Sequence, residues 1–478
     1  MLHNLEWLKP GKVFPPRVEQ ERIQRYQENA LIFDNAHFDV MSMGRFYAQC
    51  AKRITRIIDN FEDVISFPVL LNYQRLMSLK VADLVCGEYP EISCAEAGEI
   101  EEVNSAIDRT SLMENLYSTI IDISRYGESI HRVYYNEDGD VTFTCWDPCE
   151  WYPVVSQDGT RTITHHCICW TQDLNAGTDK SPDLRLHVQI HGTRPDEVGR
   201  YEYRVYRLGN KGGMIGELES SEYVETGLEY CAVQQLKAFS STSSVYGYDD
   251  YLPLDSILSE IMTRIGQISI ILDKHADPNI TGPTSMLTRD PQTGELRLGH
   301  GKFFAVSTGE EQPKYMTWEG QLQAAFKQLN ILLNQLYILS ELGSSLLGDA
   351  EKGSQAISGT ALRFKMTGPL SKARRITNSL TIPLRRLVSR MTNGKVPFEH
   401  IAITWRDGLP DDPRENMEIA KLATGKTSLM PRDVAIREFL HRTPAEADEW
   451  DVSLREVETT QRTSNNSGII YYETKSVQ

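Results

Sequence analysis

Residues 319–342 read EGQLQAAFKQLNILLNQLYILSEL, a run whose apolar residues recur every three or four positions. That spacing predicts an amphipathic helix. No charged residue occurs between Lys327 and Glu341, so the polar side chains of this run are amides and hydroxyls. Such a helix can be packed on nearly all sides, which suits a crowded, repetitive interface. Its apolar stripe consists of Leu322, Ala325, Phe326, Leu329, Leu332, Leu333, Leu336 and Leu339.

A glycine-bounded segment follows this helix. Gly343 suits the left-handed conformation that closes a last turn, and residues 349–355 carry no apolar anchor, so we predict a mobile loop over 343–357. A second helix is predicted over 358–392. We expect it to break at Gly368–Pro369 and at Pro383, and so to be kinked, because proline lacks the amide donor and clashes with the preceding turn.

The second helix is purely basic. From Lys352 to Phe398 there is no Asp or Glu, although the whole chain has a net charge of -16. A local basic block in an acidic protein can contact a polyanion, or its cations can pair with acidic groups elsewhere, and both alternatives stay open. Its cations are Lys352, Arg363, Lys365, Lys372, Arg374, Arg375, Arg385, Arg386, Arg390 and Lys395.

Length and composition indicate a soluble protein of two to four domains, with 478 residues of which 40% are hydrophobic. No run of eighteen apolar residues occurs, and the N-terminal residues lack a basic segment followed by an apolar one. We therefore expect no membrane span, no secretory signal and a cytoplasmic location. The net charge of -16 argues against tight wrapping of nucleic acid, but it allows a lumen through which DNA passes without sticking.

The eight cysteines favour reduced thiols over a disulfide framework. One cluster has a composition that could bind zinc. Its members also lie in alternating runs typical of strands, where Cys167 and Cys169 would share one face and act as small apolar residues. The cluster comprises Cys145, Cys149, His165, His166, Cys167 and Cys169.

The first 126 residues predict helices. A proline-punctuated start with a polar helix over 17–28 suggests an arm that docks on something else, and helical patterns follow over 46–86 and 98–126. Residues 127–239 instead predict a β-rich region, with alternating runs separated by hairpin signals such as Asp138–Gly139 and Asp158–Gly159. The expected strands are 129–135, 141–146, 162–170, 184–192 and 200–208.

A long helix over 249–273 precedes a compact insertion over 277–318, with short strands expected near 285–287, 295–298 and 302–306. After the basic helix, 401–405 reads as a strand, and short helices are expected over 414–424, 431–440 and 444–458, before a loosely ordered tail. Gly425–Lys426–Thr427 is not a phosphate-binding loop, because Ala420 stands where that loop needs glycine. The fold class is therefore α+β.

Five motifs, in this order and spacing, resemble the portal proteins of tailed double-stranded DNA bacteriophages, especially the long-tailed siphophage type. The likeness covers most of the chain. The motifs are LNYQRLMSLKVADLVCGEYP (71–90), YGYDD (246–250), ISGTALRFK (357–365), ITWRDGLP (403–410) and TSLMP (427–431).

The resemblance implies a portal fold with a mixed α/β wing, a two-helix stem, a small β-containing clip, a kinked channel-lining helix and an α-helical crown. The implied wing comprises 1–248, with its N-terminal arm, helices and β-rich region, and a return strand over 393–413. The other implied parts are stem helices over 249–276 and 319–342, the clip over 277–318, the tunnel loop over 343–357, the channel helix over 358–392, and the crown and flexible tail over 414–478.

The resemblance also implies a function. Family members assemble as a homo-oligomeric ring, usually of twelve copies, at one capsid vertex, so we expect location in the virion after assembly in the host cytoplasm. The ring would be the channel for DNA packaging and ejection, without sequence specificity. The implied partners are the terminase motor, the head-tail adaptor, and the major capsid and scaffolding proteins, with no membrane, cofactor, metal or enzymatic activity.

Three sets of candidate site residues follow. The tunnel-loop contact with DNA is assigned to Ser344, Asp349, Glu351, Lys352, Ser354 and Gln355; the basic face of the channel helix to Arg363, Lys365, Arg374 and Arg375; and stem packing to Ile261, Ile265, Ile268, Leu329, Leu332 and Leu336. Two alternatives remain: a zinc-dependent hydrolase or nuclease that uses the cluster at 145–169, and a plain scaffold with no path for DNA.

Overall fold

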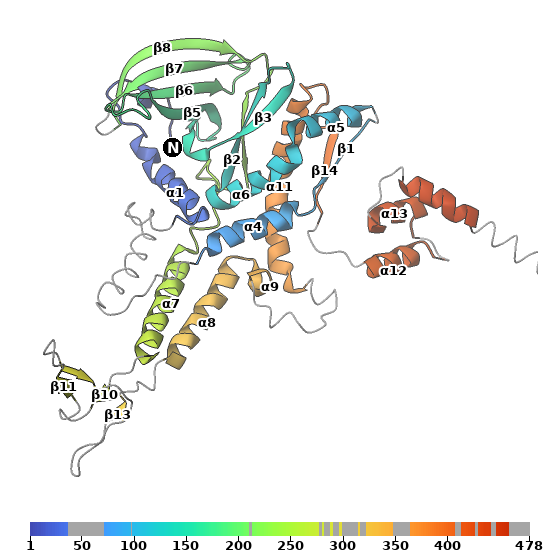
Figure 1. Cartoon of the computed structure of the whole chain (residues 1–478). Coiled ribbons are helices and arrows are strands. Elements are labelled where there is room, and N and C mark those ends of the chain that lie inside the picture. The colour runs from blue at the N-terminus through green and yellow to red at the C-terminus, as the bar shows by residue number, and fades with distance from the viewer. Residues whose placement is uncertain are drawn as a thin grey trace, which may run out of the picture. The chain divides into compact units, whose positions relative to one another are not determined.

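The structure is a computed structural model. It describes residues 1–36, 71–96, 98–209, 213–276, 280–281, 287–289, 296–298, 314–315, 322–347, 364–406, 413–425, 429–440 and 446–457. Two compact units divide the chain, Met1–Gly408 and Leu409–Gln478. Helices and sheets are both present, which confirms the α+β fold class (Figure 1).

The N-terminal segment packs on its own chain. A short helical turn, η1 (Glu6–Leu8), precedes α1 (Arg17–Phe33). Trp7 and Leu8 are buried in one apolar cluster with Tyr152 and other side chains of the β-rich region. The terminal amine of Met1 lies 3.5 Å from the buried carboxylate of Glu19. The prediction of an arm that docks elsewhere is therefore wrong, because these apolar side chains complete the chain's own core.

Three helices, α4 (Tyr73–Cys86), α5 (Glu99–Thr110) and α6 (Leu112–Tyr126), form the helical layer of this unit. The single helix predicted over 98–126 is interrupted at Ser111, whose left-handed φ of 48° ends α5 before α6 begins. Residues 46–70 of the other predicted helix lie outside the described residues. Beside α5, β1 (Glu91–Cys94) pairs antiparallel with β14 (Ile401–Thr404), which confirms the strand predicted at 401–405.

Two antiparallel sheets make up the β-rich region. The first has the order β3-β2-β9, from Val141–Trp146, Glu128–Tyr135 and Val233–Lys237. After the turn η2 (Pro148–Glu150), the second runs β4-β5-β6-β7-β8. All five predicted strands are confirmed, whereas β4, β8 and β9 were not predicted. The strands of the second sheet are Trp151–Val155, Ile163–Asp173, Leu184–Gly192, Arg200–Leu208 and Ile215–Glu225.

Two long helices, α7 (Asp255–Ala276) and α8 (Leu322–Leu339), lie side by side (Figure 1). In the insertion between them, β10 (Ile280–Thr281) pairs with β13 (Lys314–Tyr315), and β11 (Leu287–Arg289) pairs with β12 (Leu296–Leu298). The strand predicted near 295–298 is thus confirmed. Residues 302–306 lie outside the described residues.

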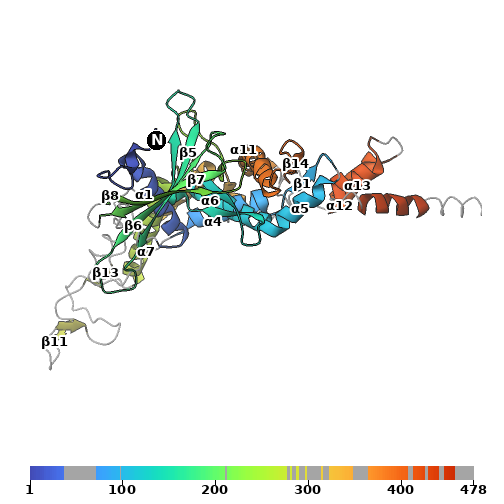
Figure 2. The same cartoon turned by 90° about the horizontal axis from the view of Figure 1, so that it is seen from above.

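After α8, the chain turns through Gly343, whose φ of 69° is the left-handed conformation predicted for it. A short helix, α9 (Gly343–Leu347), follows where a loop was expected. The basic helix α11 (Thr367–Met391) has Gly368–Pro369 in its first turn and continues through Pro383, so the break predicted there is wrong. Both views place α11 beside β14 and α5, away from β8 (Figures 1 and 2).

The C-terminal unit is helical in its described residues. It contains α12 (Pro413–Ala423), α13 (Arg432–Leu440) and a further helical stretch over 446–457. These elements confirm the three short helices predicted from the sequence.

Candidate functional site

A junction at Tyr246–Asp250 connects the β-rich region to α7. The Asp249 carboxylate accepts hydrogen bonds from the backbone amides of Tyr251 and Leu252, at 3.0 and 2.8 Å. This capped turn precedes α7, which begins at Asp255 and not at 249 as predicted. The Nε of Arg25, on α1, also donates to Asp249, at 2.7 Å.

Asp250 ties three further elements together. Its carboxylate lies 2.7 Å from the Nζ of Lys372 on α11 and accepts a 2.6 Å hydrogen bond from the Ser124 hydroxyl on α6. Lys372, only 7% exposed, also donates to the carbonyl of Ser340 just after α8, at 3.1 Å. Through these contacts, Lys372 joins the basic helix α11 to the end of α8 and to the segment that leads into α7.

Two glycines make this junction possible. A Cβ atom added to Gly247 would stand 1.9 Å from the carbonyl oxygen of Gly127, and Gly127 itself has a φ of +89°. Neither position has room for a side chain. The glycine of the YGYDD motif is therefore required by the close approach of two backbones.

A buried carboxylate, Glu128, lies under the junction. Burial raises its pKa, while nearby Arg22 acts in the opposite direction. Glu128 accepts hydrogen bonds from the Tyr26 hydroxyl, at 2.7 Å, and from Gln235. Because its partners come from α1 and β9, this carboxylate has a structural role in holding the N-terminal helix to the sheet.

The packing between α7 and α8 leaves one face of α8 uncovered. Ile261, Ile268 and Leu336 are buried, whereas Ile265, Leu329 and Leu332 are half-buried. On the outer face of α8, Ile331 is 53% exposed and Ile338 is 66% exposed. These two isoleucines are seven residues apart, so they lie on one stripe of the helix.

Several cations of α11 have partners within the chain. Arg375 pairs with Glu341 at 2.6 Å, and Arg385 donates to the carbonyls of Phe398 and Glu399, both at 3.0 Å. Lys365 and Arg374 are exposed. Arg374 has no carboxylate of the described residues within ion-pairing distance. Arg363 lies outside the described residues.

Of the tunnel-loop residues, the structure describes Ser344, which is half-buried in α9. The others, Asp349, Glu351, Lys352, Ser354 and Gln355, lie outside the described residues, so their assignment stays a prediction.

The Cys/His cluster is dispersed. Cys167 and Cys169 are buried in the apolar core, as predicted for small apolar residues on one strand face. The Nδ1 of His166 accepts a hydrogen bond from the Trp151 indole at 3.1 Å, and His165 lies 3.8 Å from Glu197. Within the described residues, which include the whole cluster, no three His, Cys, Asp or Glu side chains are grouped to hold a metal.

Sequence reasoning missed the partners in the junction, above all Asp250 and Lys372. The signal available was the YGYDD motif itself, in which one glycine and two acids directly precede a long apolar helix.

None of the helices in the described parts of the chain has the length and apolar character needed to cross a bilayer.

No protein-family model matches the chain, and no curated protein matches it in sequence. Among solved structures, the chain is similar to one from the neck of a native GTA particle computed with C12 symmetry. The two are 11% identical with a TM-score of 0.42, over 76% of this chain and 88% of that one. It is also similar to a chain from the neck of an empty GTA particle computed with C6 symmetry, at 13% identity and a TM-score of 0.45, with the same coverage.

Proposed function

We propose that the chain is the subunit of a portal ring, which sits at one capsid vertex of a tailed phage or phage-like particle. The observation that carries this proposal is the uncovered apolar stripe of α8, marked by Ile331 and Ile338. It lies on the helix that the sequence motifs relate to a portal stem. A ring gives each copy of this stripe a neighbouring subunit to cover it.

The magnitudes favour apolar packing over ion pairing as the source of assembly. Covering the exposed half of an isoleucine side chain contributes about 1 kcal/mol, and each subunit of a ring gains that at every such residue. An exposed ion pair contributes about 0–1 kcal/mol. The absence of charge between Lys327 and Glu341 removes the desolvation cost that ionic side chains would add to this interface.

In this proposal, double-stranded DNA passes through the ring during packaging and ejection. Its contacts are electrostatic and sequence-independent, made by the tunnel loop and by cations of the channel helix such as Arg374. The net charge of -16 favours passage over capture. The protein performs no catalysis. A separate terminase motor docks on the clip, and the head-tail adaptor, capsid and scaffolding proteins bind elsewhere on the ring.

The test is a charge placed on the exposed stripe. Ile338→Asp should leave the subunit folded, because this side chain is 66% exposed, but it should prevent ring formation by burying an uncompensated carboxylate in the interface. Light scattering of the parent should give a multiple of 54.3 kDa with a closed ring in negative-stain images, and the variant should give the monomer.

Val18→Asp on α1 is the matched control, since Val18 is 62% exposed and lies outside the stem. It should assemble like the parent. A parent that stays monomeric at micromolar concentrations, or an Ile338→Asp variant that still forms rings, would contradict the proposal.

A further inference from the structure

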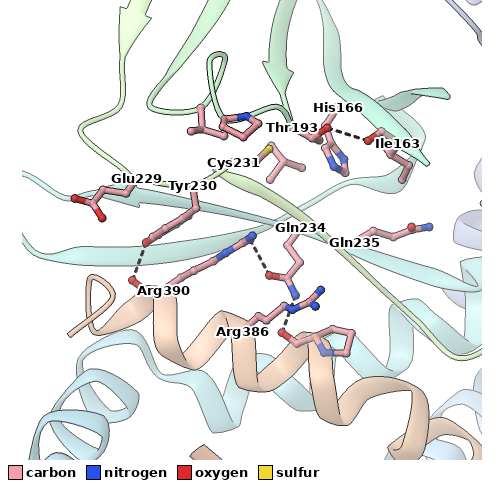
Figure 3. Close-up of a pocket in the computed structure, with 14 residues that line it drawn as sticks. Ile163, His166, Thr193, Glu229, Tyr230, Cys231, Gln234, Gln235, Arg386 and Arg390 are labelled. Atoms are coloured by element: carbon pink, nitrogen blue, oxygen red, sulfur yellow. Dashed lines mark hydrogen bonds between the residues drawn. The ribbon is translucent and has the colours of Figure 1, made fainter. Parts of the chain in front are cut away.

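A cavity of about 600 Å³ lies between β5, the connection from β6 to β7, residues 229–235 and α11 (Figure 3). Its size falls within the range of small-molecule sites. The walls combine apolar side chains, including Ile163, Val198 and Val233, with Arg386 and Arg390 from α11.

Arg390 is half-buried in this cavity without an acidic partner. It donates one hydrogen bond to the side-chain oxygen of Gln234, at 2.8 Å, and its guanidinium lies 4.9 Å from the centre of the Tyr230 ring. No carboxylate of the described residues lies within ion-pairing distance of it. Burial lowers the pKa of Arg390, and the positive charge of Arg386 acts in the same direction.

Arg386 stands one helical turn before Arg390, so the two guanidiniums lie on one face of α11. Arg386 is exposed, and its guanidinium carbon lies 5.3 Å from the centre of the Phe398 ring. Like Arg390, it has no carboxylate of the described residues within ion-pairing distance. Glu229 is the acidic residue in the cavity wall, and its carboxylate lies apart from the Arg390 guanidinium (Figure 3). The acids of this chain, 66 in all, outnumber its 50 Lys and Arg residues, so two neighbouring cations without a carboxylate are unexpected.

His166 adds a third donor. Its Nδ1 accepts the Trp151 indole hydrogen, and an indole nitrogen can only donate, so the hydrogen of the neutral imidazole must sit on Nε2. Burial, followed by the charge of Arg390, lowers the pKa of His166 to about 3, which keeps the ring neutral at physiological pH. The cavity therefore contains two guanidiniums and an imidazole N–H as donors.

We infer that this cavity binds a small oxyanion, the carboxylate or phosphate group of an organic acid or phosphate ester, between Arg386 and Arg390. Planar guanidiniums suit such groups because two N–H donors can meet two oxygens. The apolar wall formed by Ile163, Val198 and Val233 would cover the organic part of the ligand.

The experiment is calorimetric titration of the full chain with inorganic phosphate and, separately, with succinate, at constant ionic strength. We expect saturable binding of at least one probe. Arg386→Gln and Arg390→Gln should each weaken it about tenfold or more, because each removes a charge-assisted contact. Lys80→Gln removes one positive charge from α4, outside the cavity, and should bind like the parent.

Tighter binding of phosphate would identify the ligand as a phosphate ester. Tighter binding of succinate would identify it as an organic acid. If Arg390→Gln unfolds, Arg386→Gln decides the matter, since its side chain is exposed and its substitution should leave the fold intact. The inference is overturned if neither probe saturates up to about 10 mM. It is also overturned if Arg386→Gln binds as the parent does, or if Lys80→Gln weakens binding equally.

Discussion

The junction around Asp250 and the outer face of α8 belong to the same unit, but they differ in whether their side chains have partners inside the chain. At the junction, Asp249, Asp250 and Lys372 find their partners inside the chain. On α8, Ile331 and Ile338 remain exposed. Internal polar contacts therefore fix the helices at the junction, whereas the outer face of α8 keeps an exposed apolar surface, which a neighbouring copy would cover in the proposed ring.

The largest effect is expected at the glycine contact of the junction. Gly247→Ala should lower the free energy of unfolding by at least about 4 kcal/mol, or prevent folding, because the new Cβ meets the backbone oxygen of Gly127 at 1.9 Å. Urea unfolding measures this. Gly98→Ala is the control, since nothing lies within 4 Å of its added Cβ atom. A Gly247→Ala variant as stable as the control would show that the two backbones can separate easily.

The next largest effect is expected for the buried cation. Lys372→Met should lower the free energy of unfolding by about 3 kcal/mol, because it leaves Asp250 without its ion-pair partner and the Ser340 carbonyl without a donor. Arg374→Met changes an exposed cation two residues further along α11 and should have almost no effect on stability. Equal losses of unfolding free energy in the two variants would show that Lys372 does not stabilise the junction.

Lowering the pH should reduce the stability of the β-rich region more than it affects association through the face of α8. Burial lowers the pKa of His131 to about 3, against an ordinary value of 6.5. The unfolded chain then binds the proton more tightly between these values, so stability is full above pH 6.5 and falls as the pH falls below it. From pH 7 to pH 5, His131 alone should account for a loss of about 2 kcal/mol.

His131→Gln tests this contribution by unfolding at pH 7 and pH 5. The variant should lose about 2 kcal/mol less than the parent over that interval, because glutamine does not titrate. The proposed interface on α8 should not respond in this range, since no ionisable side chain except Tyr337 lies between Lys327 and Glu341. An unchanged pH dependence in the variant would mean that His131 accepts a proton in the folded state.

The secondary structure was largely predictable because it follows from local periodicity. The alternating runs of β2, β3, β5, β6 and β7 and the apolar spacing of α8 were read directly from the sequence. The edge strand β8 was missed because most of its side chains are polar and exposed. The break between α5 and α6 was missed because a serine, not a glycine, adopts the left-handed conformation there.

The partners of the charged residues could not be predicted. Arg25 and Asp249 are 224 positions apart, and no local pattern distinguishes Asp249 from the chain's other acids. Lys372 and Arg375 are both cations of the basic helix, and no local pattern shows that the first is buried and the second is exposed. The cavity beside Arg390 was missed for the same reason, since its walls come from separate parts of the chain.

The smallest effect is expected for Arg375, and it sharpens the contrast with Lys372. Its ion pair with Glu341 is short, 2.6 Å, but the two side chains are 42% and 44% exposed, so water and salt screen the attraction. Arg375→Gln should therefore lower the free energy of unfolding by less than about 1 kcal/mol, and a double-mutant cycle with Glu341→Gln should give a coupling energy that vanishes at high salt. A loss of unfolding free energy as large as that of Lys372→Met would instead show that Arg375 stabilises the junction as Lys372 does. If the small loss is found, the ion pair with Glu341 contributes little to the stability of the fold. Under the proposed portal function, a fall in DNA retention by particles carrying Arg375→Gln would then reflect a lost contact with phosphate and not a destabilised subunit.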